Sequence, residues 1–225
     1  MRKFLFVFIF LLAAKFVFAQ DESDTVGDST ARGNPIWTIS AGQFQADFSG
    51  FNSQLKTWGA TKTFLPFNTI GINLVGGVNV SRGGNFDAAL CFEKILPQQI
   101  SIGDSLKYNL YGWHFMSSIY GFFIGKPHFV ATAGPGIDWG SVKIKGNLNG
   151  NETHYKNPFV SPFIRAEFRF VFGRIVFGAR ASYRYDISKK NWEQDNSTLS
   201  TLPNSKISGL GLQFFLGARF GYIEK

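Results

Sequence analysis

The sequence predicts an all-β protein, an eight-stranded antiparallel up-and-down barrel that spans a membrane. Three observations lead to this prediction. Apolar residues occupy every second position in eight stretches after Pro35, which is the period of a β-strand. Short and long links alternate between these stretches. The 225 residues include 26 Phe and 25 Gly but are only 17% charged, which excludes a disordered chain.

Composition excludes several other classes of protein. The mean hydropathy of −0.01 is too low for a protein with several apolar membrane helices. A single cysteine, Cys91, cannot form an internal disulfide or a cysteine zinc site. We therefore predict neither a cofactor nor a metal centre.

The N-terminal segment has the pattern of a secretory signal. Arg2 and Lys3 precede the apolar run Phe4–Ala14, and Ala19 supplies the small residue before a cleavage site. This run is too short for an uncleaved membrane anchor, which needs about 20 residues. We predict cleavage between Ala19 and Gln20, which gives a signal peptide (1–19), a flexible polar leader (20–34) and a barrel domain (35–225). Cleavage would lower the net charge from +8 to +5, and the chain has no long basic run, so nucleic acid is not an expected partner.

The first five stretches differ in regularity. The first, Pro35–Asp47, alternates irregularly. The second and third have clear apolar faces, formed by Ile70, Ile72, Leu74, Val78 and Val80, and by Phe86, Ala88, Leu90 and Phe92. The fourth and fifth, Ser105–Ile124 and His128–Lys145, change phase near Gly112 and Gly140, where we expect β-bulges.

The last three stretches alternate without interruption. Their apolar faces are Val160, Pro162, Ile164, Ala166, Phe168, Phe170 and Phe172; Ile175, Phe177, Ala179, Ala181, Tyr183, Tyr185 and Ile187; and Leu210, Leu212, Phe214, Leu216, Ala218, Phe220 and Tyr222. The opposite faces hold Gly, Arg, Ser, Gln, Glu and Asp. Because no helices are predicted to cover so many apolar faces, lipid is the expected partner layer, and a closed barrel satisfies the backbone groups there.

The link lengths predict the orientation of the barrel. The links at 82–84, 125–127 and 173–174 are short, whereas those at 48–65, 94–104, 146–156 and 188–205 are long. Outer-membrane barrels have short periplasmic turns and longer external loops, so both termini are expected on the periplasmic side. In the first long link, Phe51, Leu55 and Trp58 have helical spacing, which predicts a short helix at the barrel rim; an irregular loop that buries Trp58 is the alternative.

The polar faces direct charged side chains into the barrel. We expect an interior charge network of Asp87, Glu93, Asp138, Arg165, Glu167, Arg169, Arg180, Arg184, Asp186 and Arg219, with Asp47 as a further candidate. Buried charges must be paired, and an eight-stranded barrel is just wide enough for its own side chains. A closed structural plug is therefore expected, and a selective conduction path lined by Arg and Asp is the alternative.

No catalytic residues are assigned. Acyl transfer requires a nucleophile, a base and an orienting acid, and the only candidates are His114 with Ser117 or Ser118. His128 is expected at a periplasmic turn, where lipid A is absent, and His154 lies in the third long link, where a polar residue is expected to be solvated. We predict that the protein is not an enzyme.

The whole predicted barrel resembles the small eight-stranded outer-membrane proteins of Gram-negative bacteria, of the OmpA/OmpX type and including PorT-like barrels. Gly217, Phe220 and Tyr222 match the glycine and the two aromatics of the C-terminal signal that barrel-assembly machinery reads in such proteins. Phe215 and the final Ile223-Glu224-Lys225 depart from that pattern.

The resemblance implies a monomeric barrel of the outer membrane. We expect a structural or surface-interaction role, with the links 48–65 and 188–205 exposed to lipopolysaccharide, a host surface or a partner protein. The runner-up is a narrow pore or an accessory barrel of a secretion system, and a lipid A-modifying enzyme comes third.

Overall fold

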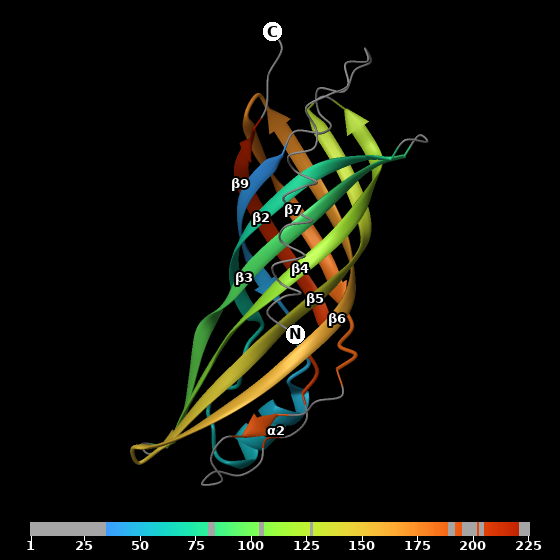
Figure 1. The fold of residues 1–225 in the computed structure, drawn as a ribbon. Helices are drawn as coiled ribbons and strands as arrows, with labels where there is room; N and C mark the ends of the chain where they lie inside the picture. The colour runs from blue at the N-terminus through green and yellow to red at the C-terminus, as the bar shows by residue number, and fades with distance from the viewer. Residues whose placement is uncertain are drawn as a thin grey trace.

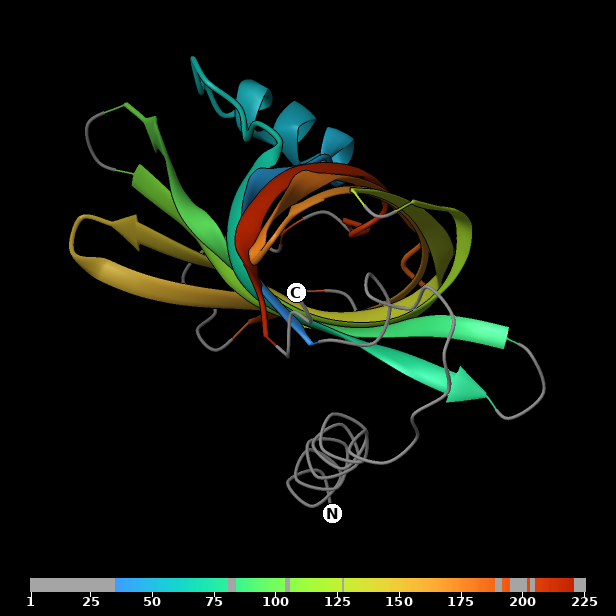
Figure 2. The ribbon, with the colours of Figure 1, turned by 90° about the horizontal axis from the view of Figure 1, so that it is seen from above.

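The computed structural model describes residues 35–80, 84–103, 106–126, 128–188, 192–194, 202 and 205–220. Within this part, eight long strands form one closed antiparallel barrel (Figures 1 and 2), which confirms the predicted fold class. These strands are β1 (Ile36–Phe44), β2 (Phe67–Val80), β3 (Gly84–Ile102), β4 (Leu106–Lys126), β5 (Phe129–Leu148), β6 (Asn151–Phe172), β7 (Ile175–Arg184) and β9 (Gly209–Arg219). The pairing of β1 with β9 closes the ring, and the two-residue β8 (Glu193–Gln194) adds to β6.

Strands β3 to β6 are about twice as long as β1, β7 and β9, with 19 to 22 residues against 9 to 11. Their excess length forms a four-stranded arm that projects from one end of the barrel, at the lower left of Figure 1. The expected long loops at 94–104 and 146–156 are therefore wrong, because most of both segments is strand. Asn149 and Gly150, with φ of 51° and 89°, form a tight hairpin turn of the type that Asn-Gly favours.

The expected phase change at Gly140 is wrong, because the β4–β5 register continues unbroken through this residue and its irregularity lies at 122–124. A register shift does lie at Gly112, since Ile95 pairs with Gly112 and Gln98 with Leu110, but the extra residue is on β3 and not on β4. What changes along these strands is the polarity of each face. On the barrel side of Trp113, from His114 to Tyr120, the inward side chains of β4 are mostly polar. On the arm side, the inward side chains of Tyr108 and Leu110 belong to an apolar cluster and are fully buried.

The apolar side chains on the inner face of the arm belong to the largest of three clusters of buried apolar residues. Helix α2 (Ser49–Thr57) packs there through Phe51 and Leu55, both fully buried, which confirms the predicted helix. Trp58 stacks on Tyr108 with ring centroids 6.2 Å apart, and burial raises the pKa of Tyr108 to about 12. Gly59, with φ of 91°, ends the helix in the left-handed conformation that glycine adopts readily.

Among the described residues, no helix is long and apolar enough to cross a membrane.

We predict that Phe51→Ala releases α2 from the arm without opening the barrel, because truncation of a buried Phe costs about 3–5 kcal/mol. Limited proteolysis should then cleave the segment 45–66 faster than in the wild type. The barrel should still change its migration between unheated and boiled samples on a denaturing gel. Lys56→Ala, at an exposed position of α2, is the control; equal cleavage of both variants would contradict the packing role of Phe51.

Candidate functional site

The barrel interior is the candidate site, because it concentrates the buried charges of the protein. Side chains alternate across a strand, so β6 directs Arg165, Glu167 and Arg169 into the lumen while Ile164, Ala166 and Phe168 face outward. On β7, Arg180 and Arg184 point inward by the same alternation. All five of these charged side chains are less than 5% exposed.

The charge cluster nearer the short turns is centred on Glu167. Its Oε1 accepts a hydrogen bond from Arg169 Nε, and its Oε2 lies 3.5 Å from Arg180 Nε. Arg169 also donates through Nη1 to Asp87 Oδ2 at 2.6 Å, and Arg180 donates to Asn73 Oδ1. Charge-assisted hydrogen bonds thus join β6 to β3 and β7 to β2 across the lumen, and an ion pair joins the neighbouring strands β6 and β7.

The second cluster, nearer the arm, is centred on His114. Its Nδ1 lies 3.0 Å from Asp138 Oδ1, and its Nε2 lies 3.2 Å from Glu93 Oε2. Asp138 forms an ion pair with Arg184, with Oδ2 2.9 Å from Nη1. Glu93 accepts a hydrogen bond from Gln213 Nε2 at 2.6 Å. This cluster joins β3, β4, β5, β7 and β9.

Arg165 lies between the clusters, and neutral groups stabilise its charge. None of the described carboxylates lies within 4.0 Å of its guanidinium nitrogens. Its Nη1 donates to Tyr120 Oη at 2.8 Å, and its guanidinium carbon lies 5.0 Å from the centre of the Phe163 ring. A cation over an aromatic face is attracted by the ring quadrupole. The aromatic residues of the lumen therefore also stabilise its charge.

Two apolar clusters bound these polar layers. Toward the short turns lie Ile36, Val75, Ala89, Tyr120, Val171, Val176 and Phe215. Toward the arm, Phe44, Phe67, Phe159 and Ile95 belong to the large cluster that includes α2. Polar side chains thus fill the middle of the lumen, and apolar side chains pack at both of its ends.

Eight of the ten predicted interior charges lie within the lumen clusters. Asp186 is buried at the barrel rim and not in the charge clusters. Its Oδ1 accepts a hydrogen bond from Ser188 N at 2.8 Å, and its Oδ2 accepts one from Ile207 N at 3.0 Å. Arg219 is only partly buried, beside Ile36 at the short-turn end. Asp47 is exposed and binds Ser49 at the start of α2. Near the strand ends the alternation no longer points into the closed part of the barrel.

His114 is the interior residue that the sequence analysis missed. The sequence offers it only as a candidate catalytic base, because the polarity change at Gly112 disguises the continuous alternation of β4. The signal that could have found it is the strand period of two, which puts His114 on the same face as Met116. Glycine at 140 is part of the same site, since a Cβ there would lie 2.5 Å from His114 Cβ.

The described residues do not form the suspected acyl-transfer group. Both ring nitrogens of His114 face carboxylates, Ser117 points out of the barrel, and Ser118 Oγ is buried without a hydrogen-bond partner. His128 lies at a short turn against Val171 O, and His154 lies on the exposed face of the arm. No cluster of potential metal ligands occurs in the described ranges.

The residues of the expected assembly signal have a partial structural account. Gly217 lies on β9, where a Cβ would lie 1.8 Å from the Trp37 carbonyl oxygen, so the close approach of β1 requires glycine. Phe220 follows β9 and is exposed. Tyr222 lies outside the described residues, as do Ala19, Gln20 and the whole of segments 1–19 and 20–34.

In comparisons with known proteins, the chain is similar to solved structures in fold only. No protein-family model matches the chain, and no curated protein matches it in sequence. A major outer membrane protein from Thermus thermophilus has a similar structure, with a TM-score of 0.50, 8% identity, and coverage of 83% of this chain and 98% of that one. Ail, the attachment invasion locus protein of Yersinia pestis, is similar with a TM-score of 0.48 and 13% sequence identity, over 84% of this chain and 99% of Ail. Neisserial surface protein A is similar with a TM-score of 0.45 and 11% sequence identity, over 83% of this chain and 97% of that protein.

We predict that Arg169→Met lowers the free energy of unfolding by about 3–5 kcal/mol, because Asp87 and Glu167 stay buried but lose the cation that pairs with both of them. Adding Asp87→Asn should recover part of the loss. Guanidinium unfolding in lipid vesicles, followed by tryptophan fluorescence, measures both changes. Lys56→Met, at an exposed position, should stay close to the wild type. A loss of less than about 1 kcal/mol for Arg169→Met would show that this cation is not needed.

Proposed function

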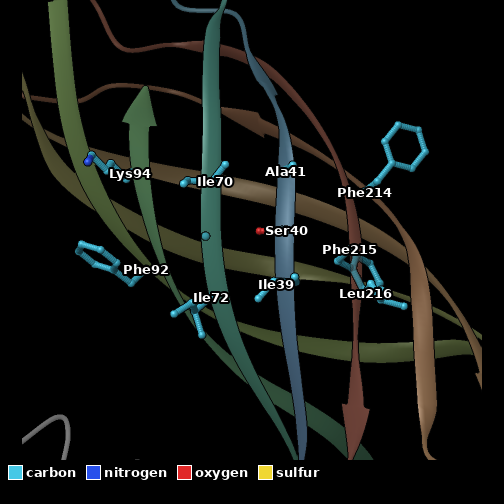
Figure 3. Close-up of a pocket in the computed structure, with 11 residues that line it drawn as sticks. Ile39, Ser40, Ala41, Ile70, Ile72, Phe92, Lys94, Phe214, Phe215 and Leu216 are labelled. Atoms are coloured by element: carbon cyan, nitrogen blue, oxygen red, sulfur yellow. The ribbon is translucent and has the colours of Figure 1, made fainter. Parts of the chain in front are cut away.

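We propose that the chain is an integral protein of a bacterial outer membrane, and that lipid covers its outward face. The observation that carries this proposal is a continuous apolar row around the barrel. Following the strand register, it passes through one outward residue on each of seven strands and then through Ile187, which follows β7: Leu216, Ile39, Ile72, Phe92, Phe115, Trp139, Val160 and Ile187 (Figure 3 labels the first four). An exposed apolar surface that encircles a protein fits hydrocarbon and not water.

The proposed orientation puts the short turns in the periplasm and the arm outside the cell. Pro35 and Phe220, the first and last described residues, meet at the short-turn end, where Phe220 N donates to Pro35 O at 2.9 Å. Trp37, Trp113, Tyr183 and Tyr185 are exposed outward aromatics, as expected for residues at the edges of a membrane. The proposal includes signal cleavage after Ala19 and recognition of Gly217, Phe220 and Tyr222 by the assembly machinery.

We further propose that the lumen is closed and that the barrel supports the arm, without acting as a pore or an enzyme. The two ion-paired clusters and the apolar packing at both ends of the lumen favour the plug. The arm, held by α2, would then be the part that meets a partner outside the cell. An accessory role in a secretion system is compatible with the same architecture and remains the second candidate.

A planar-bilayer recording tests the closed lumen. We expect no discrete conductance steps from the purified protein, provided that its gel migration shifts on boiling and so indicates a folded barrel. Discrete steps that grow when Arg180 or Arg184 is replaced by Ala would overturn the plug. They would support a conduction path through the charge network.

The enzyme hypothesis has its own test. We expect His114→Gln and the wild type to leave the same lipid A species in the outer membrane of a Gram-negative host, as measured by mass spectrometry. A new lipid A species that needs His114 would contradict a non-enzymatic role.

A further inference from the structure

His114 is fully buried in the barrel interior, and each of its ring nitrogens faces a carboxylate. Nδ1 is hydrogen-bonded to Asp138 Oδ1 at 3.0 Å, and Nε2 lies 3.2 Å from Glu93 Oε2. A neutral imidazole has a proton on one nitrogen and a lone pair on the other, whereas an imidazolium has a proton on both. A neutral ring would therefore direct a lone pair at a carboxylate within 3.2 Å, so the arrangement fits the imidazolium.

The surrounding contacts favour a proton on the ring over a proton on either carboxyl group. Glu93 accepts a hydrogen bond from Cys91 Sγ at 3.1 Å through Oε1 and one from Gln213 Nε2 at 2.6 Å through Oε2. Asp138 Oδ2 lies 2.9 Å from Arg184 Nη1. A carboxylate is a stronger acceptor than a neutral carboxylic acid, so these contacts are satisfied best when both carboxyl groups are ionised.

The charge balance of the lumen gives the same result. In the cluster around Glu167, two carboxylates face two guanidinium groups. In the cluster around His114, two carboxylates face one guanidinium group within the described part of the chain, that of Arg184. Arg165 does not complete this cluster, because its partners are a phenol hydroxyl, a thioether and an aromatic ring. A proton on His114 supplies the missing positive charge.

Side chains from five other strands surround the His114 ring. They are Glu93 and Cys91 on β3, Asp138 on β5, Phe159 on β6, Arg184 on β7 and Gln213 on β9, with Arg165 of β6 beyond them at Met116. The arginines stay charged at every relevant pH. Histidine is the side chain that changes charge most readily near neutral pH, so a pH response of this cluster centres on His114. The thiol of Cys91 is the alternative that an experiment must separate.

A line of contacts joins this cluster to helix α2. The guanidinium carbon of Arg184, which pairs with Asp138, lies 4.2 Å from the centre of the Phe44 ring. From there, consecutive ring centroids are 6.1, 5.2 and 6.3 Å apart in the order Phe44, Phe67, Phe48 and Phe51. Phe51 belongs to α2. On the other side, the His114 ring lies 6.3 Å from the ring of Phe159, which is in the same apolar cluster as α2.

We propose that Glu93, His114 and Asp138 form a proton-binding site that holds α2 on the arm. With the proton bound, the imidazolium joins β3, β4 and β5 beneath the apolar cluster. When the proton passes to water, one ring nitrogen presents a lone pair to a carboxylate, the ring moves away from it, and the packing against α2 loosens. The docked form of α2 is thus stabilised while the proton is bound, and this stabilisation is lost as the pH rises. The inference goes beyond the proposed function, because it adds a response to pH and requires no particular partner.

Nitrogen-15 NMR of the histidine-labelled protein, purified in detergent, tests where the proton is. The chain contains three histidines, so the background His128→Gln with His154→Gln leaves His114 as the source of the ring signals. At pH 7.5, where an unperturbed histidine is mostly neutral, we expect both ring nitrogens to carry a proton. A neutral tautomer with one bare nitrogen at this pH would overturn the proposal.

Limited proteolysis between pH 6 and pH 9.5 tests the link to α2. The cleavage rate of segment 45–66 is divided by that of an unstructured peptide at the same pH, which removes the response of the protease itself. We expect this ratio to rise in the wild type as His114 loses its proton, by up to about tenfold for each pH unit, the limit for the release of one proton. In His114→Gln, which cannot change charge, the ratio should not vary with pH.

Two further variants assign the response to one group. Cys91→Ser keeps a donor beside Glu93 without the thiol, and His128→Gln removes a histidine at a short turn; both should keep the rise seen in the wild type. A flat profile in the wild type, an unchanged rise in His114→Gln, or loss of the rise in Cys91→Ser would overturn the proposal. A gel shift on boiling at each pH must accompany the rise, since loss of the shift would show unfolding of the whole barrel and would also overturn a local release of α2.

Discussion

The stabilisation of four buried guanidinium groups constrains most of this structure. Arg165, Arg169, Arg180 and Arg184 project into a barrel that has room only for side chains, and a buried charge without a partner costs several kcal/mol. Arg169 and Arg180 bind Asp87 and Asn73 on strands at the far side of the lumen, so these hydrogen bonds also fix the distance across the barrel. The other partners, Glu167, Asp138 and Tyr120, come from strands one or two places away. The small inward residues follow from this, since Gly136, Gly140 and Gly178 leave space for the rings and charged groups opposite them.

The two ends of the barrel face different surroundings, and the strands change accordingly. Through most of the barrel, apolar side chains point outward and polar ones inward. In the arm the relation is reversed, since Leu110, Val142 and Ile144 point toward α2 while Lys107, Lys143 and Lys145 point away from it. One continuous pair of strands thus serves both environments without a change of register. Helix α2 is needed for this reason, because it covers apolar surface that water would otherwise contact. A plugged lumen leaves the outer wall and the arm as the surfaces available to partners.

The sequence by itself determined the all-β class, the number of spanning strands and which face of β6, β7 and β9 points inward, because strand alternation is a local property of the chain. It also placed eight charges of the interior, and seven of them lie within regular alternating runs, whereas Asp138 lies in the less regular fifth stretch. Only the tertiary structure decided that 94–102 and most of 146–156 are strand, that His114 lies between Asp138 and Glu93, and that Asp186 binds backbone amides at the rim. Those outcomes depend on which neighbour each face meets, and neither the cover supplied by α2 nor the carboxylates opposite His114 can be read from the residues beside them in the chain.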